Sequence, residues 1–525
     1  MINTTKTTDN WALILSKKDA RIAELEALVK YYEGQLLLAK HRQYGSSSEK
    51  MNPGQLNLFD EAENTADPER SEPDLEEIVY KRRKQKGKRE DDLSALPTET
   101  IEYVLPEEDR NCVECGGKLH TMSHDVRREL EIVPASVKVI EYKRAVYSCR
   151  ACEKNNDHVP IVKAPMPESV IKGSLASPST VAHIMYQKYV MCSPLYRQEK
   201  DWERQGVYLN RQTMANWVNR CSADWLEPLY DRMQLKLLTS EVLHADETVV
   251  QVLKEPDKKP QASSYMWLYR TSGDARHPIV LYDYQVSREH IHPKLFLKDF
   301  KGYLHADGYA GYHALPVTII ACWVHMRRKF EESLKAMPEA DRPGSLAQQA
   351  LNRIARLFHL ETLWAGLPPE ERYEKRKSVS MPLAEAFFVW IEGLDVLPKM
   401  PIGQARKYAL DQRPRLMNVY LDGRCELSNN RAENSIRPFV VGRKNWLFCD
   451  TQKGAKASAV VYSMIETAKE NGLKPYDYLK FLFETVPQAT TGALDSLLPW
   501  GDAVPMHCRM PVKAKEGQHG EKKRA

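Results

Sequence analysis

The sequence predicts a multidomain α+β protein, and three observations support this fold class. The chain has 525 residues, which is too long for one ordinary hydrophobic core. Two CxxC pairs in its first third predict a small metal-binding module. Near residue 242 the apolar pattern changes from helical spacing to short runs typical of strands. We therefore expect an N-terminal coiled coil, a four-cysteine zinc module, a helix-turn-helix region and an α/β domain that contains a helical insertion.

The composition is that of a globular chain. Hydrophobic residues make up 42% and charged residues 28%, and the formal net charge is +5. No apolar stretch reaches the ~18 residues of a membrane span, and the N-terminus lacks the apolar segment of a signal peptide. We therefore expect a cytoplasmic protein without a membrane partner. Basic runs at residues 81–89 and 522–524 suit phosphate backbones, with a solvated linker and tail as the alternative.

Residues 11–45 predict a coiled-coil zipper. Apolar residues recur there at alternating three- and four-residue steps: Ile22, Leu25, Val29, Tyr32 and Leu36. We expect this zipper to associate copies of the chain, with an amphipathic helix packed on its own chain as the alternative. Residues 46–95 carry many charges and few large apolar clusters, which predicts a linker that includes the first basic run.

Residues 96–158 predict a zinc-binding module. Cys112 and Cys115 form one CxxC pair, followed by two glycines that permit the tight turn of a zinc knuckle, and Cys149 and Cys152 form the other. Without a secretion signal, such pairs favour a metal over disulfides, and four thiolates suit a tetrahedral structural Zn²⁺. The alternative is a pair of reduced turns without metal. Strands are expected between the two pairs, at residues 136–142 and 145–148.

Residues 160–230 predict a helix-turn-helix region that binds DNA. Ser177 and Asn210 are suitable N-caps for two of the three expected helices, and Gly206 ends the helix between them. Three polar residues of the last helix have side chains that suit bases or phosphates: Arg211, Gln212 and Asn216. A plain helical bundle without DNA contacts is the alternative.

Residues 236–450 predict the α/β domain. Five apolar runs are typical of strands: residues 242–252, 264–271, 278–285, 302–307 and 317–324. Helices are expected after the third, fourth and fifth runs, the first of them capped by Ser287. This order, βββαβαβα, is that of a ribonuclease-H-like fold, in which the first and fourth strands lie side by side.

The remaining segments are expected to be helical or unstructured. Residues 337–425 predict a helical insertion in the α/β domain, and residues 451–510 a C-terminal helical region whose ordered part ends near Trp500. Residues 511–525 are expected to form a disordered basic tail.

Three carboxylates predict a site for two divalent cations. Two strands end in the same four residues, Leu-His-Ala-Asp, which places Asp246 and Asp307 at adjacent strand ends. Glu433 lies at the start of a later helix, which Asn429 or Asn430 is expected to cap. Mg²⁺ or Mn²⁺ prefers such oxygen ligands and leaves positions open for phosphate and water. Two metals of this kind catalyse phosphoryl transfer, so the sequence predicts an enzyme that cuts DNA.

Other residues near these carboxylates need separate consideration. Glu426 and Asp422 are competing acids in an expected loop, whereas Glu247 should point to the opposite face of its strand from Asp246. His244 and His305 precede the two aspartates by two residues and are expected to be satisfied strand histidines. A polyanionic substrate favours a basic rim. Its candidates, besides a phosphate contact expected at His325, are Arg431, Arg437, Arg443 and Lys444.

These residues resemble the transposase of the insertion sequence 66 family over nearly the whole chain. The resemblance rests on Cys112-x-x-Cys115-Gly-Gly, Ala245-Asp246-Glu247-Thr248, Asp307-Gly308-Tyr309 and the run from Asn429 to Trp446. It implies a DDE triad of Asp246, Asp307 and Glu433 with two Mg²⁺ ions, and cleavage and transfer of double-stranded DNA at terminal inverted repeats. It also implies a target DNA, helper proteins of the same element and a bacterial, nucleoid-associated location. It assigns no role to His244 or His305.

Two other functions are compatible with parts of this sequence. A catalytically inactive DNA-binding regulator would keep the fold, but the presence of all three carboxylates argues against it. A resolvase-like nuclease would not need a zipper, a zinc module and a helix-turn-helix region together.

Overall fold

The computed structural model describes residues 18, 29, 100, 136–148, 161–298 and 300–511. The chain divides into two compact units, one of residues 1–56 with 167–509 and the other of residues 57–166 with 510–525. All four CxxC cysteines, both basic runs and all but two residues of the expected zipper lie outside the described residues. No helix in the described part is long and apolar enough to cross a membrane.

The described part of the smaller unit is a short antiparallel hairpin. Strand β1 (Val146–Ser148) pairs with β2 (Ile161–Lys163), and Arg144 Nε donates a hydrogen bond to Ala164 O at 2.5 Å. The expected strand at residues 145–148 is therefore confirmed. The one expected at residues 136–142 is wrong, because these residues pair with no strand that the structure describes.

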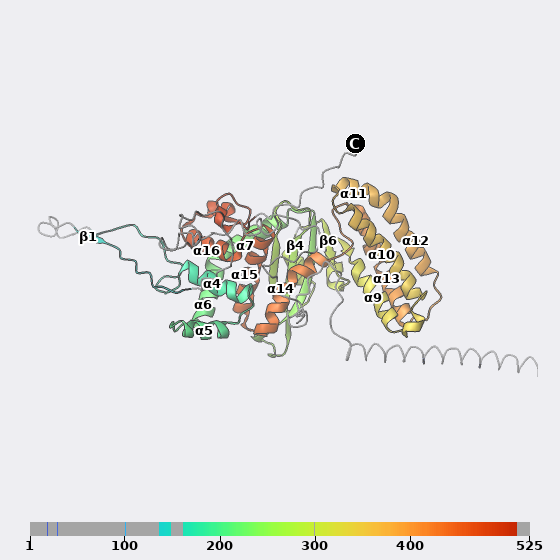
Figure 1. Ribbon diagram of the computed structural model, residues 1–525, viewed down its shortest axis with the longest axis horizontal. Helices are drawn as coiled ribbons and strands as arrows, with labels where there is room; N and C mark the ends of the chain where they lie inside the picture. Colours follow the sequence, from blue (N-terminus) through green and yellow to red (C-terminus); the bar gives the residue numbers. More distant parts are fainter. Residues whose placement is uncertain are drawn as a thin grey trace, which may run out of the picture. The chain divides into compact units, whose positions relative to one another are not determined.

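A six-stranded mixed sheet forms the centre of the larger unit (Figure 1). Its strands are β3 (Val242–Lys254), β4 (Ser263–Thr271), β5 (Val280–Gln285), β6 (Tyr303–Ala306), β7 (Thr318–Ala321) and β8 (Cys449–Thr451). The spatial order is β5-β4-β3-β6-β7, and β8 pairs with the far end of β3. β3, β4 and β5 are antiparallel, whereas β6 runs parallel to both β3 and β7. The prediction that the first and fourth strands lie side by side is thus confirmed.

The segments that connect the strands differ from the predicted bounds at the start of α8 and at the end of β7. Helix α8 (Ile291–Leu297) begins later than expected, because Ser287 does not cap it and instead shares a hydrogen bond with His292 Nε2 at 2.8 Å. A 3-10 helix, η4 (Ala310–Ala314), follows β6. β7 ends at Ala321 rather than residue 324, since Cys322 is the N-cap of helix α9 (Trp323–Lys335). The first residues of α9 are apolar, as are those of the buried strand β7 before it. Periodicity alone therefore could not show where the strand ends and the helix begins.

Between residue 161 and the sheet, the structure describes four α-helices: α4 (Pro178–Tyr189), α5 (Leu195–Arg204), α6 (Arg211–Cys221) and α7 (Glu227–Leu237). Both predicted N-caps are confirmed, since Ser177 Oγ accepts from the Thr180 amide at 3.1 Å and Asn210 Oδ1 accepts from the Thr213 amide at 2.8 Å. Gly206 ends α5 with φ +80°, a conformation that glycine adopts without steric cost. The helix, turn and helix expected here are therefore present.

Helices α9 to α13 form a separate bundle at the β7 edge of the sheet (Figure 1, yellow to orange). Its further helices are α10 (Leu346–Trp364), α11 (Pro369–Lys375), α12 (Met381–Glu392) and α13 (Pro401–Met417). Trp323, Phe330, Phe387 and Phe388 fill its core. Arg376, 1% exposed, binds Glu361 and the carbonyl groups of residues 422 and 423. This guanidinium holds the bundle to the chain that leads back to the sheet.

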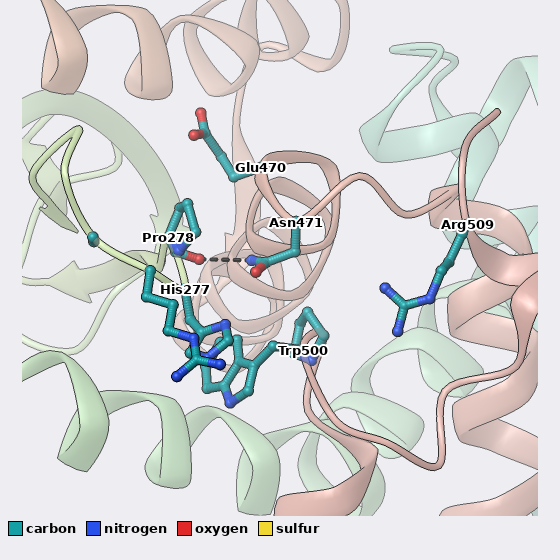
Figure 2. Close-up of a pocket in the computed structure, with 9 residues that line it drawn as sticks. His277, Pro278, Glu470, Asn471, Trp500 and Arg509 are labelled. Carbon is teal, nitrogen blue, oxygen red and sulfur yellow. Dashed lines mark hydrogen bonds between the residues drawn. The ribbon is translucent and has the colours of Figure 1, made fainter. Parts of the chain in front are cut away.

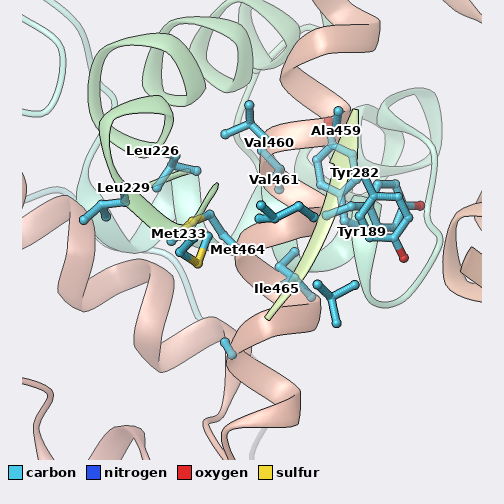
Figure 3. Close-up of a cluster of buried hydrophobic side chains, with 14 of the residues drawn as sticks. Tyr189, Leu226, Leu229, Met233, Tyr282, Ala459, Val460, Val461, Met464 and Ile465 are labelled. Atoms are coloured by element: carbon cyan, nitrogen blue, oxygen red, sulfur yellow. The ribbon is translucent and has the colours of Figure 1, made fainter. Parts of the chain in front are cut away.

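Helix α15 (Gln452–Glu470) is buried between α4, α7 and the edge strand β5 (Figure 3). Its hydroxyl groups bind the outer backbone edge of β5. Ser463 Oγ accepts from the Tyr282 amide at 2.8 Å, and Thr467 Oγ1 accepts from the Val280 amide at 3.0 Å. An unpaired edge strand invites association with other chains, so α15 both completes the core and protects this edge.

The C-terminal part of the larger unit is longer than expected. Helix α16 (Pro475–Thr485) packs against α4 and α15. The ordered chain does not end near Trp500, because a bridge between Leu473 and Arg509 ties the final segment to the start of α16. This pairing joins residues far apart in sequence, and no local pattern announced it.

Replacing Thr467 by valine should keep the shape of the side chain but leave the buried Val280 amide without its acceptor. An unsatisfied buried donor costs about 1–3 kcal/mol, so amide exchange in residues 278–285 should become faster. Hydrogen exchange followed by mass spectrometry measures this directly. Thr362→Val is the matched control, since Thr362 is exposed and its hydroxyl binds only its own helix. Equal exchange in the two variants would contradict the assignment.

Candidate active site

Strand register places Asp246 and Asp307 at the same level of two neighbouring strands. Parallel pairing of β3 with β6 sets His244 opposite His305, and each aspartate follows its histidine by two residues. Asp307 comes directly after the last residue of β6, and its Oδ1 accepts from the Tyr309 amide at 2.9 Å. Asp307 thus follows a strand end, as the sequence predicted, whereas the strand end predicted at Asp246 is wrong, because β3 continues to Lys254 and Asp246 pairs with Leu268 of β4. Asp246 instead lies just past the last residue of β3 that pairs with β6.

Glu433 lies in the first turn of helix α14 (Asn430–Trp446), which packs on β3, and its charge acts on Asp246. Among the described residues, its ligand atoms lie within 4.8 Å of those of Cys322 and His325, whereas the three carboxylates do not form such a group. Burial, followed by the charge of Glu247, raises the pKa of Asp246 well above its usual range. The charges of Glu433 and Asp307 raise this pKa further. The three carboxylates thus repel one another in a partly buried space, and a bound divalent cation would relieve that repulsion.

The environment of Glu433 suits a metal ligand. Its Oε1 atom is buried and has no hydrogen-bond partner among the described residues. The His325 Nε2 atom lies 3.9 Å away, and burial lowers the pKa of this histidine despite the opposing effect of Glu433. A carboxylate oxygen that is buried without a donor requires an explanation, and a cation bound at this oxygen would supply one.

The structure places His325 beside the carboxylates rather than only on a basic surface. It lies in the first turn of α9, and the ligand atoms of Cys322, His325 and Glu433 are within 4.8 Å of one another. Burial raises the pKa of Cys322 to about 11, and its sulfur already accepts from the Asn429 amide at 3.2 Å. This thiol is a poor ligand, so His325 is the better additional donor. The CxxH spacing at a strand end was the signal that could have identified it.

The competing acids each have an arginine partner. Glu426 binds Arg431 at 2.5 Å, and Asp422 binds Arg424 at 2.7 Å. These charges are therefore compensated, whereas Glu433 Oε1 has no hydrogen-bond partner among the described residues.

Glu247 belongs to a buried network of its own. Its side chain is 2% exposed, and it accepts from Arg288 Nε at 2.7 Å and from the Tyr312 hydroxyl at 2.5 Å. Arg288 also lies 3.8 Å from Asp307 Oδ2 and stacks over the Tyr309 ring. The guanidinium therefore links Glu247 to one of the three carboxylates, and no local sequence pattern indicates this contact.

The four residues of the expected basic rim differ in their surroundings: two bind other parts of the protein, one is half-buried and one is exposed. Arg431 is paired with Glu426, and Arg443 donates to Thr248 Oγ1 at 3.2 Å and to the Val249 carbonyl, which fastens α14 to β3. Arg437 is half-buried and Lys444 is exposed. The three residues expected to contact DNA lie together on the exposed face of α6: Arg211, Gln212 and Asn216.

A cavity of about 450 Å³ lies elsewhere in the larger unit (Figure 2). The rings of His277 and Trp500 stack at 5.3 Å on one side, and Asn471 donates to the Pro278 carbonyl at 2.7 Å. None of the three carboxylates lines this cavity.

Family comparisons agree along most of the chain. Residues 173–457 match the model described as "Transposase IS66 family", and residues 109–153 match "zinc-finger binding domain of transposase IS66". Residues 463–500 match "IS66 C-terminal element", and residues 31–101 match "Transposase C of IS166 homeodomain". The zinc finger supports a structural Zn²⁺ in this chain.

Two individual proteins are similar to this chain over most of its length. The chain is 30% identical over 429 residues to "Uncharacterized protein y4jD" of Sinorhizobium fredii, covering 78% of this chain and 81% of that protein. It is also 30% identical over 421 residues to "Uncharacterized protein y4hP" of the same organism, covering 76% and 74%. With family matches along most of its length, this chain belongs to the IS66 family of transposases.

Proposed function

We propose that this transposase cuts and joins DNA strands at a two-metal site held by Asp246, Asp307 and Glu433. The observation that supports the proposal is the parallel register of β3 with β6, which sets Asp246 and Asp307 on neighbouring strands, together with the packing of α14, which carries Glu433, on β3. The sheet order supports a ribonuclease-H-like catalytic domain over residues 236–450, interrupted by the helical insertion.

The donor set of this site fits Mg²⁺ or Mn²⁺. All three groups offer hard oxygen atoms, one of which is buried without a partner among the described residues. Burial, and after it the charge of neighbouring carboxylates, raises the pKa of Asp246, and a cation would stabilise its ionised form. Bound metals would activate the attacking water or 3′-hydroxyl and stabilise the leaving oxygen. His325 is placed to add a neutral nitrogen ligand beside Glu433, while Arg288 limits the negative charge around Asp307.

The substrate is proposed to be the terminal inverted repeats of the element, followed by a target duplex. The exposed face of α6 would read the repeats, and the exposed Lys444 beyond the carboxylates would contact phosphates. The basic run at residues 81–89 would add affinity that depends on salt. We further propose self-association through residues 11–45 and cooperation with helper proteins of the same element.

Asp246→Asn, Asp307→Asn and Glu433→Gln should each reduce strand cleavage by several orders of magnitude. Each change keeps the size of the side chain but removes the charge that holds a cation, and most of the transition-state stabilisation at such a site is electrostatic. Cleavage of a labelled duplex carrying the terminal repeat measures the effect, and a mobility-shift assay should show unchanged binding.

Glu484→Gln is the matched control for these variants. Glu484 is exposed on α16 and pairs only with Lys480, so cleavage should remain at the parental rate. Parental cleavage by Glu433→Gln together with loss of cleavage in Glu426→Gln would show that the third carboxylate is wrong. Cleavage by all three triad variants would refute the catalytic proposal and favour a DNA-binding regulator.

Gln212→Ala combined with Asn216→Ala should weaken binding to the terminal repeat by about 1–3 kcal/mol for each base that α6 no longer recognises, with little effect on unrelated DNA. Fluorescence anisotropy with both duplexes at one salt concentration separates these effects. Gln488→Ala changes an exposed glutamine outside the helix-turn-helix and should bind as the parent does. An equal loss of affinity for both duplexes would mean that α6 contacts only the backbone.

Cys112, Cys115, Cys149 and Cys152 should hold about one Zn²⁺ per chain at ~2.3 Å from sulfur. Metal analysis and X-ray absorption of the purified protein test this. Replacing Cys112 and Cys149 by serine should remove the metal, whereas Cys192→Ser, outside either pair, should retain it. Disulfides at the four positions in reduced protein would contradict the assignment.

A further inference from the structure

Three buried polar side chains form a row across the sheet, on three adjacent strands. Pairing sets His305 of β6 opposite His244 of β3, and His244 opposite Arg270 of β4. Paired residues share one face of a sheet, and both histidines are fully buried while Arg270 is 3% exposed. We call these residues the polar row. Burial of three polar groups side by side is costly unless each has a partner.

Each member of the polar row binds the segment that carries Glu433. His305 Nε2 accepts from the Glu426 amide at 3.2 Å. His244 Nδ1 lies 3.0 Å from Asn429 Oδ1, and Arg270 donates to the Arg431 carbonyl at 3.4 Å and to Ser435 Oγ. The row therefore contacts, in order, the loop before α14, its N-cap residue and its first turns.

The side chain of Asn429 binds the sheet instead of capping α14. It occupies the N-cap position of α14, where an asparagine side chain ordinarily accepts from an amide of the first turn. Its side chain makes no such bond. It donates instead to the Ala245 carbonyl at 2.8 Å, one residue before Asp246, and its Oδ1 faces His244. One amide thus ties the start of the Glu433 helix to the strand that carries Asp246.

The hydrogen bonds also determine which ring nitrogen carries the proton in His244 and in His305. The Asn429 amide nitrogen donates to Ala245, so its oxygen must accept from His244 Nδ1. His305 Nε2 accepts from an amide, so its proton lies on Nδ1. The rings stack with centroids 4.2 Å apart and planes 10° apart. Stacking joins β3 to β6 at the level just before the two aspartates.

We infer that His244, His305 and Asn429 are positioning residues that set Glu433 relative to Asp246 and Asp307, and thereby determine how tightly the site binds its metals. This inference rests on the proposed two-metal function. In this role the three residues act through the ligands and not as ligands, by holding three elements in one arrangement. A displacement of about 1 Å between ligands is enough to weaken such a site strongly.

The test is a Mn²⁺ titration of the full chain followed by electron paramagnetic resonance, with cleavage measured at the same metal concentrations. His244→Phe keeps the flat ring but lacks the donor, and Asn429→Ala removes the other half of the bond. Both should weaken Mn²⁺ binding at least tenfold, with unchanged affinity for terminal-repeat DNA. His244→Asn offers an amide donor near the position of Nδ1 and should recover most of the Mn²⁺ affinity.

Two controls make each outcome decisive. Phe483→Leu opens space in the core under α16 and should lower the melting temperature without changing Mn²⁺ affinity, which separates positioning from general stability. Asp246→Asn should abolish the binding of at least one Mn²⁺. If Asp246→Asn binds Mn²⁺ as the parent does, the two-metal proposal fails. If it does not, but His244→Phe and Asn429→Ala titrate like the parent, only the positioning inference fails. Should His244→Phe not fold, Asn429→Ala decides.

Discussion

The docking of α14 onto the central sheet is the constraint on which the candidate site depends. Two carboxylates come from strands that pair directly, so backbone hydrogen bonds fix their separation. The third comes from a helix that starts more than 100 residues later in the chain, and only tertiary contacts bring it into place. Buried histidine, arginine and asparagine side chains provide these contacts, and Arg443 repeats the attachment further along the same helix.

This arrangement reconciles stability with function. Burial of Asp246 destabilises its charged form, and the charges of Glu247, Glu433 and Asp307 add to this effect, so the pKa of Asp246 is raised. The negative charges next to the site are compensated by arginines, which pair with Glu426, Asp422 and Glu247. Among these acids of the described chain, Glu433 keeps a buried oxygen without a hydrogen bond. Such unrelieved cost is typical of positions selected for binding a ligand.

The helical bundle makes this docking possible across a long insertion. It packs on β7, and buried Arg376 holds the chain at residues 422 and 423, just before the loop that contacts His305. The returning segment is therefore restrained before it reaches the sheet. The bundle has its own aromatic core, and α14, which follows it in the chain, packs on the same sheet as the strands before it.

The sequence by itself determined the order of strands and helices and the two helix caps before the sheet, because these follow from local periodicity and from residue chemistry. It also predicted three carboxylates as metal ligands, but the structure places Asp246 within β3 and not at a strand end. It misplaced the starts of α8 and α9 and missed β8, since an apolar helix start, a strand end and a three-residue strand look alike in one dimension. It treated His244 and His305 as ordinary strand residues and Asn429 as a candidate cap. Only the tertiary structure decided that these side chains bind one another, because hydrogen bonds between residues 185 positions apart depend on packing and leave no trace in local pattern.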